Sequence, residues 1–543
     1  MERIWLSQYS DGVPKDIAQF PFTDLVSLIE DKFARYRDKP CIECAGRVFT
    51  FGEIDTLSRQ FAAYLQREMG LGKGDNIALM TPNLPAFPVA MMGALRAGCT
   101  VVNVNPLYTP RELEHQLRDS QAKAMIVFTA VAPTFAAVAG GLDLDKVLLI
   151  GPQDLFLPAA ARPETPAGLG EVTWFHQAVQ DGAGMDFAPI AVTGDDLAFL
   201  QYTGGTTGLS KGAMLTHGNV TANVHQCEEW LAPKIIEGEE LIVTALPLYH
   251  IFALVVNLFI YFNAGGCNLL IPNPRDMAAF LGALQGRAFT AMTGVNTLYN
   301  GLQHVPAFRE MDFSQLRMCL GGGAAIQAAV AEGWKALTGC MIHEGYGLSE
   351  TSPVLTINPL TNDTFTATIG VPVPATDLSL RDDDGNEVAM GEPGEICARG
   401  PQVMKGYWNR PDETAAVMTP DGYFKTGDIA VVDDRGYFTI VDRKKDMILV
   451  SGFNVYPNEI EAVLAGHSDV VEAACVGVPD DDTGEAVKVF VVKKPDSALE
   501  ADEVRAWCRE RLTPYKTPKQ VVFLDELPKS TVGKILRREL RDA

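Results

Sequence analysis

Strand-like segments alternate with helix-like segments near the start of the chain, and this alternation limits the fold more than any other feature. Thr50 and Glu53 have the spacing of a capping box, and the apolar residues that follow recur at helical intervals from Ile54 to Leu65. The segments predicted next are a strand over 76–80, a helix over 86–96, a strand over 99–104, a helix from Pro110 and a strand over 124–128. Because strands alternating with helices form a parallel sheet covered on both faces, we expect an α/β fold.

The length of the chain indicates more than one domain. Its 543 residues exceed what a single hydrophobic core usually holds. Residues 152–192 are rich in Pro, Ala and Gly and are interpreted as an irregular connection. From Asp377 to Trp408, short apolar runs separated by Asp-Gly and Pro-Gly turns predict a β-rich subdomain. Around Cys41 and Cys44, residues 40–51 are predicted to form two short strands about a turn.

The composition excludes several classes of protein. A net charge of −23 argues against nucleic-acid binding and against an electrostatic membrane anchor. The mixed, charged N-terminus does not have the pattern of a signal peptide. Ten scattered cysteines fit a reduced cytoplasmic protein, and the lone CxxC of Cys41 and Cys44 is interpreted as accidental. The apolar window 251–262 is shorter than the roughly 20 residues of a membrane span, so we predict a buried or pocket-lining helix.

Residues 202–212 form a loop suited to polyphosphate. Three glycines, at 204, 205 and 208, allow a tight turn that presents backbone N–H groups, and the threonines and Lys211 add donors and one positive charge. The loop follows the apolar segment 197–200. It is not a Walker A loop, because Lys211 is followed by Gly212 instead of Ser or Thr. Taken alone, it could also be a flexible surface turn.

Four further motifs follow in order along the chain. Tyr346 stands between two glycines, so its ring could lie flat against a purine base, and Glu350 is a hard oxygen ligand suited to Mg²⁺. Asp428 follows a turn glycine and could accept both hydroxyls of a ribose. The remaining motifs are residues 442–446 with 451–453, and residues 528–534 near the C-terminus.

Together these motifs carry a resemblance that covers nearly the whole chain. The sequence resembles the adenylate-forming superfamily of acyl-CoA synthetases, adenylation domains and luciferases. Within that superfamily it is most similar to the bacterial long-chain-fatty-acid–CoA ligases, through residues 102–113, 421–447 and 450–461. The resemblance implies a large N-terminal domain of α/β layers with a β-rich subdomain over 1–441, a hinge over 442–445, and a small mobile α+β C-terminal domain over 446–543.

The resemblance also implies a two-step reaction. A carboxylate attacks the α-phosphorus of MgATP to give an acyl-adenylate and pyrophosphate, and the thiol of coenzyme A then displaces AMP. Thr203 and Glu350 match Mg²⁺ ligands, and Lys211, Glu350 and Lys534 match catalytic positions. The positions that match ATP-binding residues are Tyr202, Thr203, Gly204, Gly205, Thr206, Thr207, Gly208, Leu209, Ser210, Lys211, Gly212, Ala213, Gly322, Gly323, Ala324, Glu344, Gly345, Tyr346, Gly347, Asp428 and Arg443.

Five further residues match positions with other roles. Lys534 matches the lysine that reaches the carboxylate and the α-phosphate, and Lys445 matches the hinge residue whose torsions change between the two steps. Gly452 would let the backbone approach the pantetheine arm. His250 and Leu254 would line the acyl site, although a packed or solvated histidine and a plain core helix explain these residues as well. Some relatives place a tryptophan gate where this chain has Leu254.

The sequence therefore predicts a cytoplasmic, Mg²⁺- and ATP-dependent fatty acyl-CoA ligase. The predicted partners are fatty acid, ATP and coenzyme A, with no nucleic acid; loose association with the cytoplasmic face of the inner membrane and a homodimer are further expectations. The alternatives are a fatty-acyl-AMP ligase, a medium-chain acyl-CoA ligase and a non-catalytic fatty-acid-binding or uptake partner. Lys211, Glu350 and Lys534 are all present, which argues against a non-catalytic protein.

Overall fold

The computed structural model describes residues 2–144, 146–156, 165, 167–203, 210–480, 482–530 and 535–541. The chain forms two compact units. The large unit comprises Trp5–Asp377 and Arg399–Gly422, and the small unit comprises Met1–Ile4, Leu378–Ala398 and Tyr423–Ala543. The predicted hinge at 442–445 lies inside the small unit.

A seven-stranded sheet forms one half of the large unit. All neighbouring strands are parallel except β8 and β9, which form an antiparallel pair at one edge. The strand order is β7 (Thr173–Trp174), β6 (Lys146–Ile150), β5 (Ala124–Phe128), β3 (Asn76–Met80), β4 (Thr100–Asn103), β8 (Leu197–Thr203) and β9 (Lys211–Thr216).

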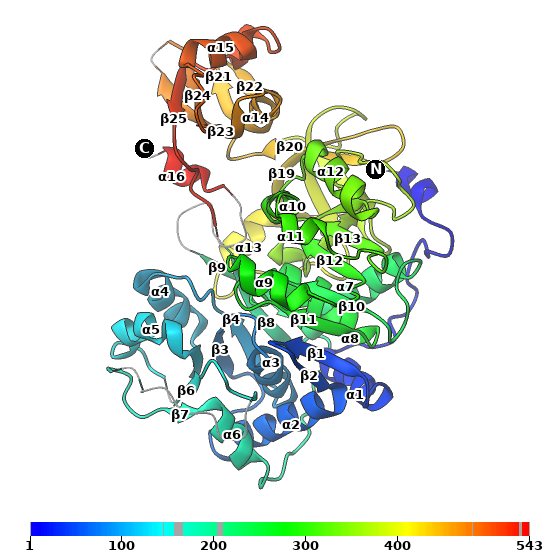
Figure 1. Ribbon diagram of the computed structural model, residues 1–543, viewed down its shortest axis with the longest axis vertical. Coiled ribbons are helices and arrows are strands. Elements are labelled where there is room, and N and C mark those ends of the chain that lie inside the picture. The colour runs from blue at the N-terminus through cyan, green and yellow to red at the C-terminus, as the bar shows by residue number, and fades with distance from the viewer. Residues whose placement is uncertain are drawn as a thin grey trace. The chain divides into compact units, whose positions relative to one another are not determined.

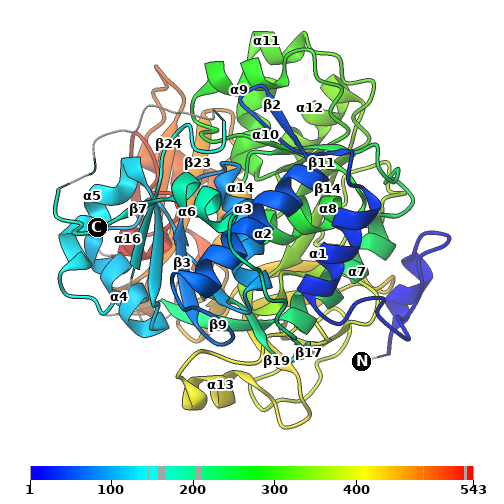
Figure 2. The same cartoon turned by 90° about the horizontal axis from the view of Figure 1, so that it is seen from below.

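Helices cover both faces of this sheet. Helices α4 (Pro110–Ser120) and α5 (Ala132–Ala139) lie on one face, and α2 (Phe51–Arg67), α3 (Ala86–Arg96) and α6 (Phe175–Gly182) lie on the other (Figures 1 and 2). The predicted capping box is present, since the Thr50 hydroxyl accepts the Glu53 N–H at 3.1 Å and the Glu53 carboxylate accepts the Thr50 N–H at 2.8 Å. The predicted α/β layers and their first elements are confirmed.

A nine-stranded sheet forms the other half of the large unit. Its central strands are parallel, and antiparallel pairs close both edges. The order is β16 (Val371–Pro372), β15 (Val354–Ile357), β14 (Ile342–Gly347), β13 (Met318–Gly321), β12 (Ala291–Gly294), β10 (Leu241–Thr244), β11 (Cys267–Leu270), β1 (Pro40–Cys44) and β2 (Arg47–Thr50).

The remaining helices of the large unit are α1 (Leu25–Arg35), α7 (His217–Leu231), α8 (Ile260–Asn263), α9 (Met277–Leu284), α10 (Asn296–Gln303), α11 (Pro306–Arg309), α12 (Ala328–Thr338) and α13 (Pro411–Val417). Trp334, Tyr299 and Phe308 belong to the core between helices α9 to α12 and the nine-stranded sheet. Strands β1 and β2 confirm the two short strands predicted around Cys41 and Cys44. Both thiols are buried, and burial raises the pKa of Cys44 to about 12.

The apolar window 251–262 is helical and buried, as predicted, but most of it is not α-helical. Residues Ala253–Phe259 form a π-helix, in which the Ile260 N–H donates to the Val255 carbonyl five residues earlier, and α8 follows directly. Asn257, the one polar residue of this stretch, bonds the Val243 carbonyl and the hydroxyls of Thr244 and Thr293. Within the described parts of the chain, no helix combines the length and apolar character needed to cross a bilayer.

The small unit contains a four-stranded sheet of β17 (Asp377–Arg381), β18 (Gly394–Arg399), β19 (Phe424–Val432) and β20 (Phe438–Arg443). The predicted β-rich subdomain therefore exists, but its extent differs from the prediction. Residues 400–408 contain no strand, and the sheet is completed by two strands that lie later in the chain.

The rest of the small unit is a mixed α+β fold, as expected. Its sheet has the order β22 (Phe453–Val455), β21 (Ile448–Val450), β24 (Gly484–Lys493) and β23 (Val470–Asp480), and β25 (Gln520–Phe523) pairs in parallel with β24. The helices are α14 (Pro457–Ala465), α15 (Ala501–Arg509) and α16 (Arg537–Arg541).

Candidate active site

The predicted phosphate loop connects β8 to β9. Thr203 and Lys211 are directly opposite each other in the antiparallel ladder, so the two ends of the loop are held side by side. Gly204, Gly205, Thr206, Thr207, Gly208 and Leu209 lie outside the described residues. Gly212 packs closely on Tyr202, because a Cβ at Gly212 would lie 3.0 Å from the tyrosine ring. Glycine at this position therefore lets the two strands approach.

Helix α4 supports both ends of the loop. The Tyr202 hydroxyl donates to Asp119 at 2.7 Å, and Arg410 donates to the other oxygen of the same carboxylate at 2.5 Å. On the far side, the His115 ring nitrogen Nε2 lies 2.9 Å from the Ser210 carbonyl. Burial, reinforced by Asp119, raises the pKa of Tyr202 above its usual value. The Tyr202 hydroxyl therefore faces the helix.

Thr203 and Glu350 converge at the end of β8. The Thr203 hydroxyl lies 3.4 Å from Glu350 Oε1, and the Tyr407 hydroxyl donates to the same oxygen at 2.9 Å. The ammonium of Lys211 lies 5.3 Å from the centroid of the Tyr407 ring and forms an ion pair with Glu413 of α13. Three of the predicted phosphate and metal residues are thus brought together around one tyrosine.

A tight turn after β13 carries the predicted adenine residues Gly322, Gly323 and Ala324. Gly323 has a φ of 77°, a conformation that strongly favours glycine. A Cβ at Gly322 would lie 3.3 Å from the Gly345 carbonyl and 3.2 Å from the Phe252 ring. The turn therefore packs against β14 and against the start of the apolar window 251–262.

Glu344 fixes this turn to β14. Its carboxyl oxygen Oε1 accepts the Ile326 N–H at 2.8 Å, and burial raises its pKa to about 7. Tyr346, also on β14, is half-buried and is the ladder partner of Thr356. The two predicted residues of β14 therefore differ: Glu344 is buried and bonds the turn, whereas Tyr346 is partly exposed.

The predicted acyl residues lie beside β8, the strand that leads into the predicted phosphate loop. The Gln201 amide donates to the Tyr249 carbonyl at 2.9 Å, which links β8 to the residue before His250. His250 is half-buried and its carbonyl accepts the Leu254 N–H at 3.0 Å. Leu254 is fully buried at the start of the π-helix. Both residues therefore stand at the junction between β8 and the apolar segment.

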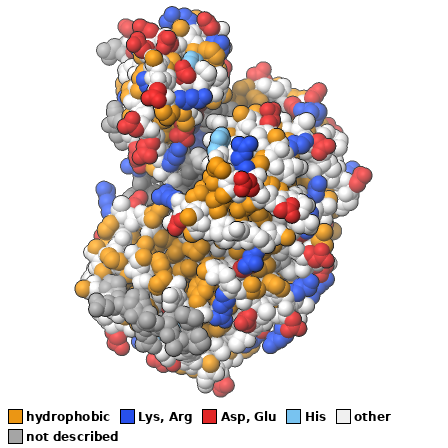
Figure 3. Space-filling view, viewed as in Figure 1, with side chains coloured by type: hydrophobic (Ala, Val, Ile, Leu, Met, Phe, Trp, Pro, Cys, Tyr) orange, Lys and Arg blue, Asp and Glu red, His pale blue; other side chains and the backbone are white. Residues whose placement is uncertain are grey.

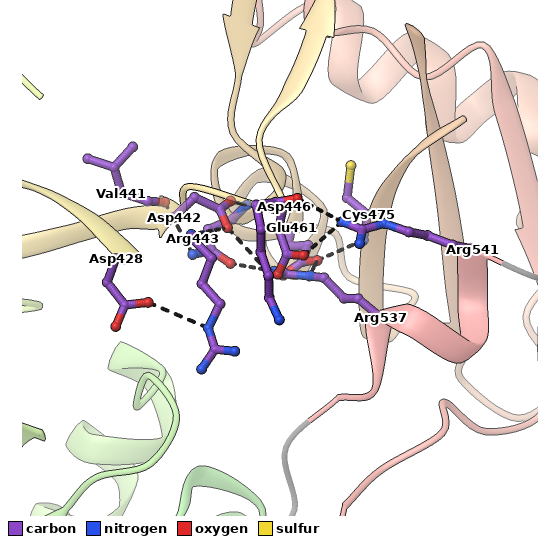
Figure 4. Close-up of polar contacts among 11 residues, drawn as sticks. Asp428, Val441, Asp442, Arg443, Asp446, Glu461, Cys475, Arg537 and Arg541 are labelled. Carbon is purple, nitrogen blue, oxygen red and sulfur yellow. Dashed lines mark hydrogen bonds and ion pairs between the residues drawn. The ribbon is translucent and has the colours of Figure 1, made fainter. Parts of the chain in front are cut away.

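The predicted ribose residues lie in the small unit (Figure 4). Asp428 on β19 and Arg443 on β20 are ladder partners, and the Arg443 Nε lies 3.5 Å from Asp428 Oδ1. Gly452 has a φ of 83° in the turn between β21 and β22, and a Cβ there would meet open space. Lys445 is the second residue after the end of β20. Lys534 lies outside the described residues.

A carboxylate–arginine cluster surrounds the predicted hinge. Arg537 of α16 forms two hydrogen bonds with Glu461, at 3.1 and 2.7 Å, and lies 3.4 Å from Asp442 and 3.5 Å from Asp446 (Figure 4). Arg541 donates to Asp446 at 2.7 Å. Burial raises the pKa of Asp442 and of Glu461 despite the opposing effect of Arg537. Carboxylates on both sides of Lys445 are therefore held by arginines of the C-terminal helix.

Sequence reasoning missed the residues that support the site. Tyr407 contacts Glu350, and Glu413 contacts Lys211. Asp119 contacts Tyr202, and His115 contacts Ser210. The two residues of each pair are 57 to 202 positions apart in the chain. The Gly-Tyr-Trp sequence at 406–408 was the available signal, because large aromatic residues after a glycine in an irregular segment usually have packing partners.

Two family models and several curated relatives match the chain. Residues 29–408 match the family model described as AMP-binding enzyme, and residues 459–534 match that of the AMP-binding enzyme C-terminal domain. Long-chain-fatty-acid–CoA ligases of Salmonella typhimurium and Yersinia pestis are 52% and 51% identical, over 100% of this chain and 98% of theirs.

A solved structure has the same fold. The crystal structure of ATP-bound MatB from Rhodopseudomonas palustris superposes with a TM-score of 0.83 at 30% identity, covering 95% of this chain and 98% of that one. The resemblance stated from the motifs is confirmed, and the chain belongs to the AMP-binding enzyme family.

Proposed function

We propose that the chain is an AMP-forming long-chain-fatty-acid–CoA ligase. It activates the carboxylate of a fatty acid with ATP, releasing pyrophosphate, and then transfers the acyl group from AMP to the thiol of coenzyme A. The observation that carries the proposal is the convergence of Thr203, Lys211 and Glu350 at the ends of the β8–β9 loop. The full-length identity to ligases of this name supports the choice of substrate.

In the first step the large unit would hold the triphosphate in line with the attacking carboxylate. Lys211 and the backbone of the loop would offset charge on the phosphates. Lys211 is held by Tyr407 and Glu413, and a charge that is already in place lowers the barrier. Thr203 and Glu350 supply two oxygen donors beside the loop, a donor set that fits Mg²⁺, which takes its other ligands from phosphates and water. Mg²⁺, when bound, neutralises charge on the phosphate oxygens.

The roles of the nucleoside-binding residues are proposed residue by residue. Gly322, Gly323 and Ala324, with Tyr346, enclose the adenine, and Glu344 fixes the turn that carries the three. Asp428 and Arg443 are proposed to bind the ribose hydroxyls; their ladder pairing places a carboxylate acceptor beside a guanidinium donor.

The acyl chain would follow the apolar π-helical segment from His250 and Leu254. Each buried CH₂ contributes roughly 0.8 kcal/mol, so kcat/KM should rise steeply from medium to long chains. Kinetics across short- to long-chain acids test this. A maximum at butyrate or at an aromatic acid would overturn the long-chain preference and leave the adenylating chemistry intact. Because Leu254 is fully buried, we do not assign a gate to it.

The second step is proposed to need a different orientation of residues 446–543, reached by rotation at Lys445. Gly452 would then let the backbone approach the pantetheine arm. Lys445→Pro fixes φ near roughly −65° and should allow acyl-AMP to form while blocking thioester formation. Acyl-CoA production at the wild-type rate by this variant would rule out the hinge.

Lys534 is proposed to act only in the first step. Lys534→Ala should lower acyl-adenylate formation about 10²–10³-fold, since one preorganised electrostatic contact is lost. The variant should convert synthetic acyl-AMP and coenzyme A at close to the wild-type rate. If both half-reactions fall together, Lys534 is structural; if neither falls, it is a solvated lysine.

A fatty-acyl-AMP ligase is the alternative within the same family. Release of AMP measured with and without coenzyme A separates the two, because a ligase of that kind would form acyl-AMP and not turn over with coenzyme A. A non-catalytic fatty-acid-binding protein would release no AMP under either condition.

We further propose a homodimeric, cytoplasmic enzyme that associates loosely with the membrane to collect its substrate. Hydrophobic side chains gather on one face of the large unit (Figure 3), and Leu107 of this unit is 59% exposed. Flotation with phospholipid vesicles and analytical ultracentrifugation test the two expectations. Protein that stays at the bottom of the gradient, or sediments as a monomer, contradicts the corresponding one.

A further inference from the structure

We propose that Tyr407 is a positioning residue for the phosphate site, which orients Glu350 through its hydroxyl and supports Lys211 through its ring. The inference rests on the proposed function, because it takes Glu350 and Lys211 as the residues that meet Mg²⁺ and the triphosphate. It adds a residue from a segment that has no phosphate motif of its own.

The hydroxyl of Tyr407 fixes the rotation of the Glu350 carboxylate. It donates to Oε1 at 2.9 Å, and Thr203 approaches the same oxygen at 3.4 Å. Glu350 and Tyr407 are each at most 9% exposed, so water competes little for the hydrogen bond between them. A hydrogen bond to a buried charged group contributes about 1.5–3 kcal/mol. A carboxylate held in this way needs little reorientation when a cation arrives.

The ring of Tyr407 faces Lys211. The ammonium lies 5.3 Å from the ring centroid, within the range of a cation–π interaction, and the lysine side chain is 17% exposed. Glu413 of α13 provides the ionic partner. The same side chain therefore contacts one negative and one positive residue of the site.

The backbone of Tyr407 is held independently of its side chain. Tyr407 forms an antiparallel bridge with Ala213 on the loop's second strand, and its N–H donates to the Thr414 hydroxyl at 2.9 Å. Nearby, the Met404 N–H donates to the Glu350 carbonyl at 2.8 Å. Removing the hydroxyl alone should therefore leave the segment in place.

The competing interpretation is that Tyr407 is a core tyrosine whose hydroxyl only needs an acceptor. Tyr36 provides a matched control within the large unit. It is 5% exposed, its hydroxyl donates to Glu237 at 2.7 Å, and the Arg35 guanidinium lies 5.3 Å from its ring centroid. The two tyrosines have the same kinds of contact, but only Tyr407 contacts residues assigned to phosphate and metal.

The test compares Tyr407→Phe, Tyr407→Leu and Tyr36→Phe in the full-length protein. The probes are Mn²⁺, followed by electron paramagnetic resonance, and the ATP analogue with a methylene bridge between the α- and β-phosphorus atoms, which cannot transfer AMP. Thermal unfolding of each variant reports any purely structural effect.

We expect Tyr407→Phe to weaken Mn²⁺ binding in the presence of the analogue about tenfold, the lower part of the range for a charged hydrogen bond. Tyr407→Leu should in addition weaken binding of the analogue itself, because Lys211 loses the ring. Tyr36→Phe should change neither. Its unfolding temperature should fall only slightly, because the acceptor of its hydroxyl, Glu237, is more than half exposed.

Two outcomes distinguish failure of the inference from failure of the proposed function. If the wild-type protein binds Mn²⁺ with the analogue and Tyr407→Phe binds it equally well, the inference is wrong and the proposed function stands. If the wild-type protein binds no Mn²⁺ with the analogue, the proposed metal site is wrong and the inference falls with it.

Discussion

Two clusters centred on carboxylates, one in each unit, differ in the groups that hold them. In the large unit, Glu350 receives hydrogen bonds from the hydroxyls of Thr203 and Tyr407. In the small unit, Glu461 receives two hydrogen bonds from the guanidinium of Arg537. Both carboxylates are largely removed from water.

The difference separates a binding role from a structural one. A hydroxyl orients a carboxylate without cancelling its charge, whereas a guanidinium cancels the charge and holds the chain in place. We therefore interpret the Glu350 cluster as prepared for an incoming cation and the Arg537 cluster as a clamp around residues 442–446.

The largest effect is expected in the clamp. Arg537→Met should lower the free energy of unfolding of the small unit by about 3–5 kcal/mol, because Glu461 and fully buried Asp442 lose their cationic partner. Differential scanning calorimetry measures this. Arg541→Met is the matched control, since it removes an arginine at the edge of the cluster and should cost less. If both variants lost the same free energy of unfolding, Arg537 would not be the main stabilising residue of the cluster.

Glu350→Gln should have the opposite profile. The first half-reaction, measured as exchange of pyrophosphate into ATP, should slow about 10²–10³-fold, because a charge aimed at the metal and phosphates is lost. The unfolding temperature should stay close to that of the wild type, since the amide oxygen can still accept the Tyr407 hydroxyl. A stable variant with unchanged exchange would refute the metal role, and an unfolded one would refute the distinction drawn here.

Glu344 is another buried carboxyl. It accepts the Ile326 N–H, and burial raises its pKa from 4.5 to about 7. Between these two pH values the folded state binds more protons than the unfolded state, so stability should fall as pH rises, by about 3 kcal/mol in all. Glu344→Gln keeps the acceptor and should remove this part of the pH dependence. Urea unfolding at about pH 5 and about pH 8 compares the two proteins. Parallel profiles would show that Glu344 ionises normally.

The smallest effect concerns the two aspartates that flank Lys445. Asp442 accepts the Asn458 N–H at 2.8 Å and contacts Arg537, so it joins the start of the predicted hinge to residues that follow the hinge. Asp446 bonds Arg541, and both of these residues follow the hinge. Asp442→Asn should speed hydrogen exchange of residues 440–450 about tenfold, through loss of roughly 1.4 kcal/mol of local stability. Asp446→Asn should change it less. The reverse order would argue against a hinge at Lys445.

Local signals in the sequence predicted local structure well. The capping box at Thr50 and Glu53, the strands around the β8–β9 loop and the helical window at 251–262 each depend on residues close together in the chain. Such signals reflect backbone propensities and periodicity, which do not require knowledge of the fold.

Contacts between distant residues could not be predicted in this way. Tyr407 and Glu350 are 57 residues apart, Arg410 and Asp119 are 291 apart, and Arg537 and Asp442 are 95 apart. Their side chains are ordinary in composition and obtain their roles only from the fold. The π-helix was also missed, because an extra residue in a helical turn leaves no clear mark on a stretch that is apolar apart from Asn257.

The extra residue in the turn of the π-helix bears on how related enzymes can come to differ in their specificity for the fatty acid. A π-helical turn is less stable than an α-helical one and persists where the added residue has a use. Deleting one residue from Ala253–Phe259 should convert the segment to α-helix and raise its stability, while turning Leu254 by about 100° relative to Tyr261. If this segment lines the acyl site, as proposed, the loss of a single codon would exchange one side chain that faces the acyl chain for its neighbour, and would stabilise the helix at the same time.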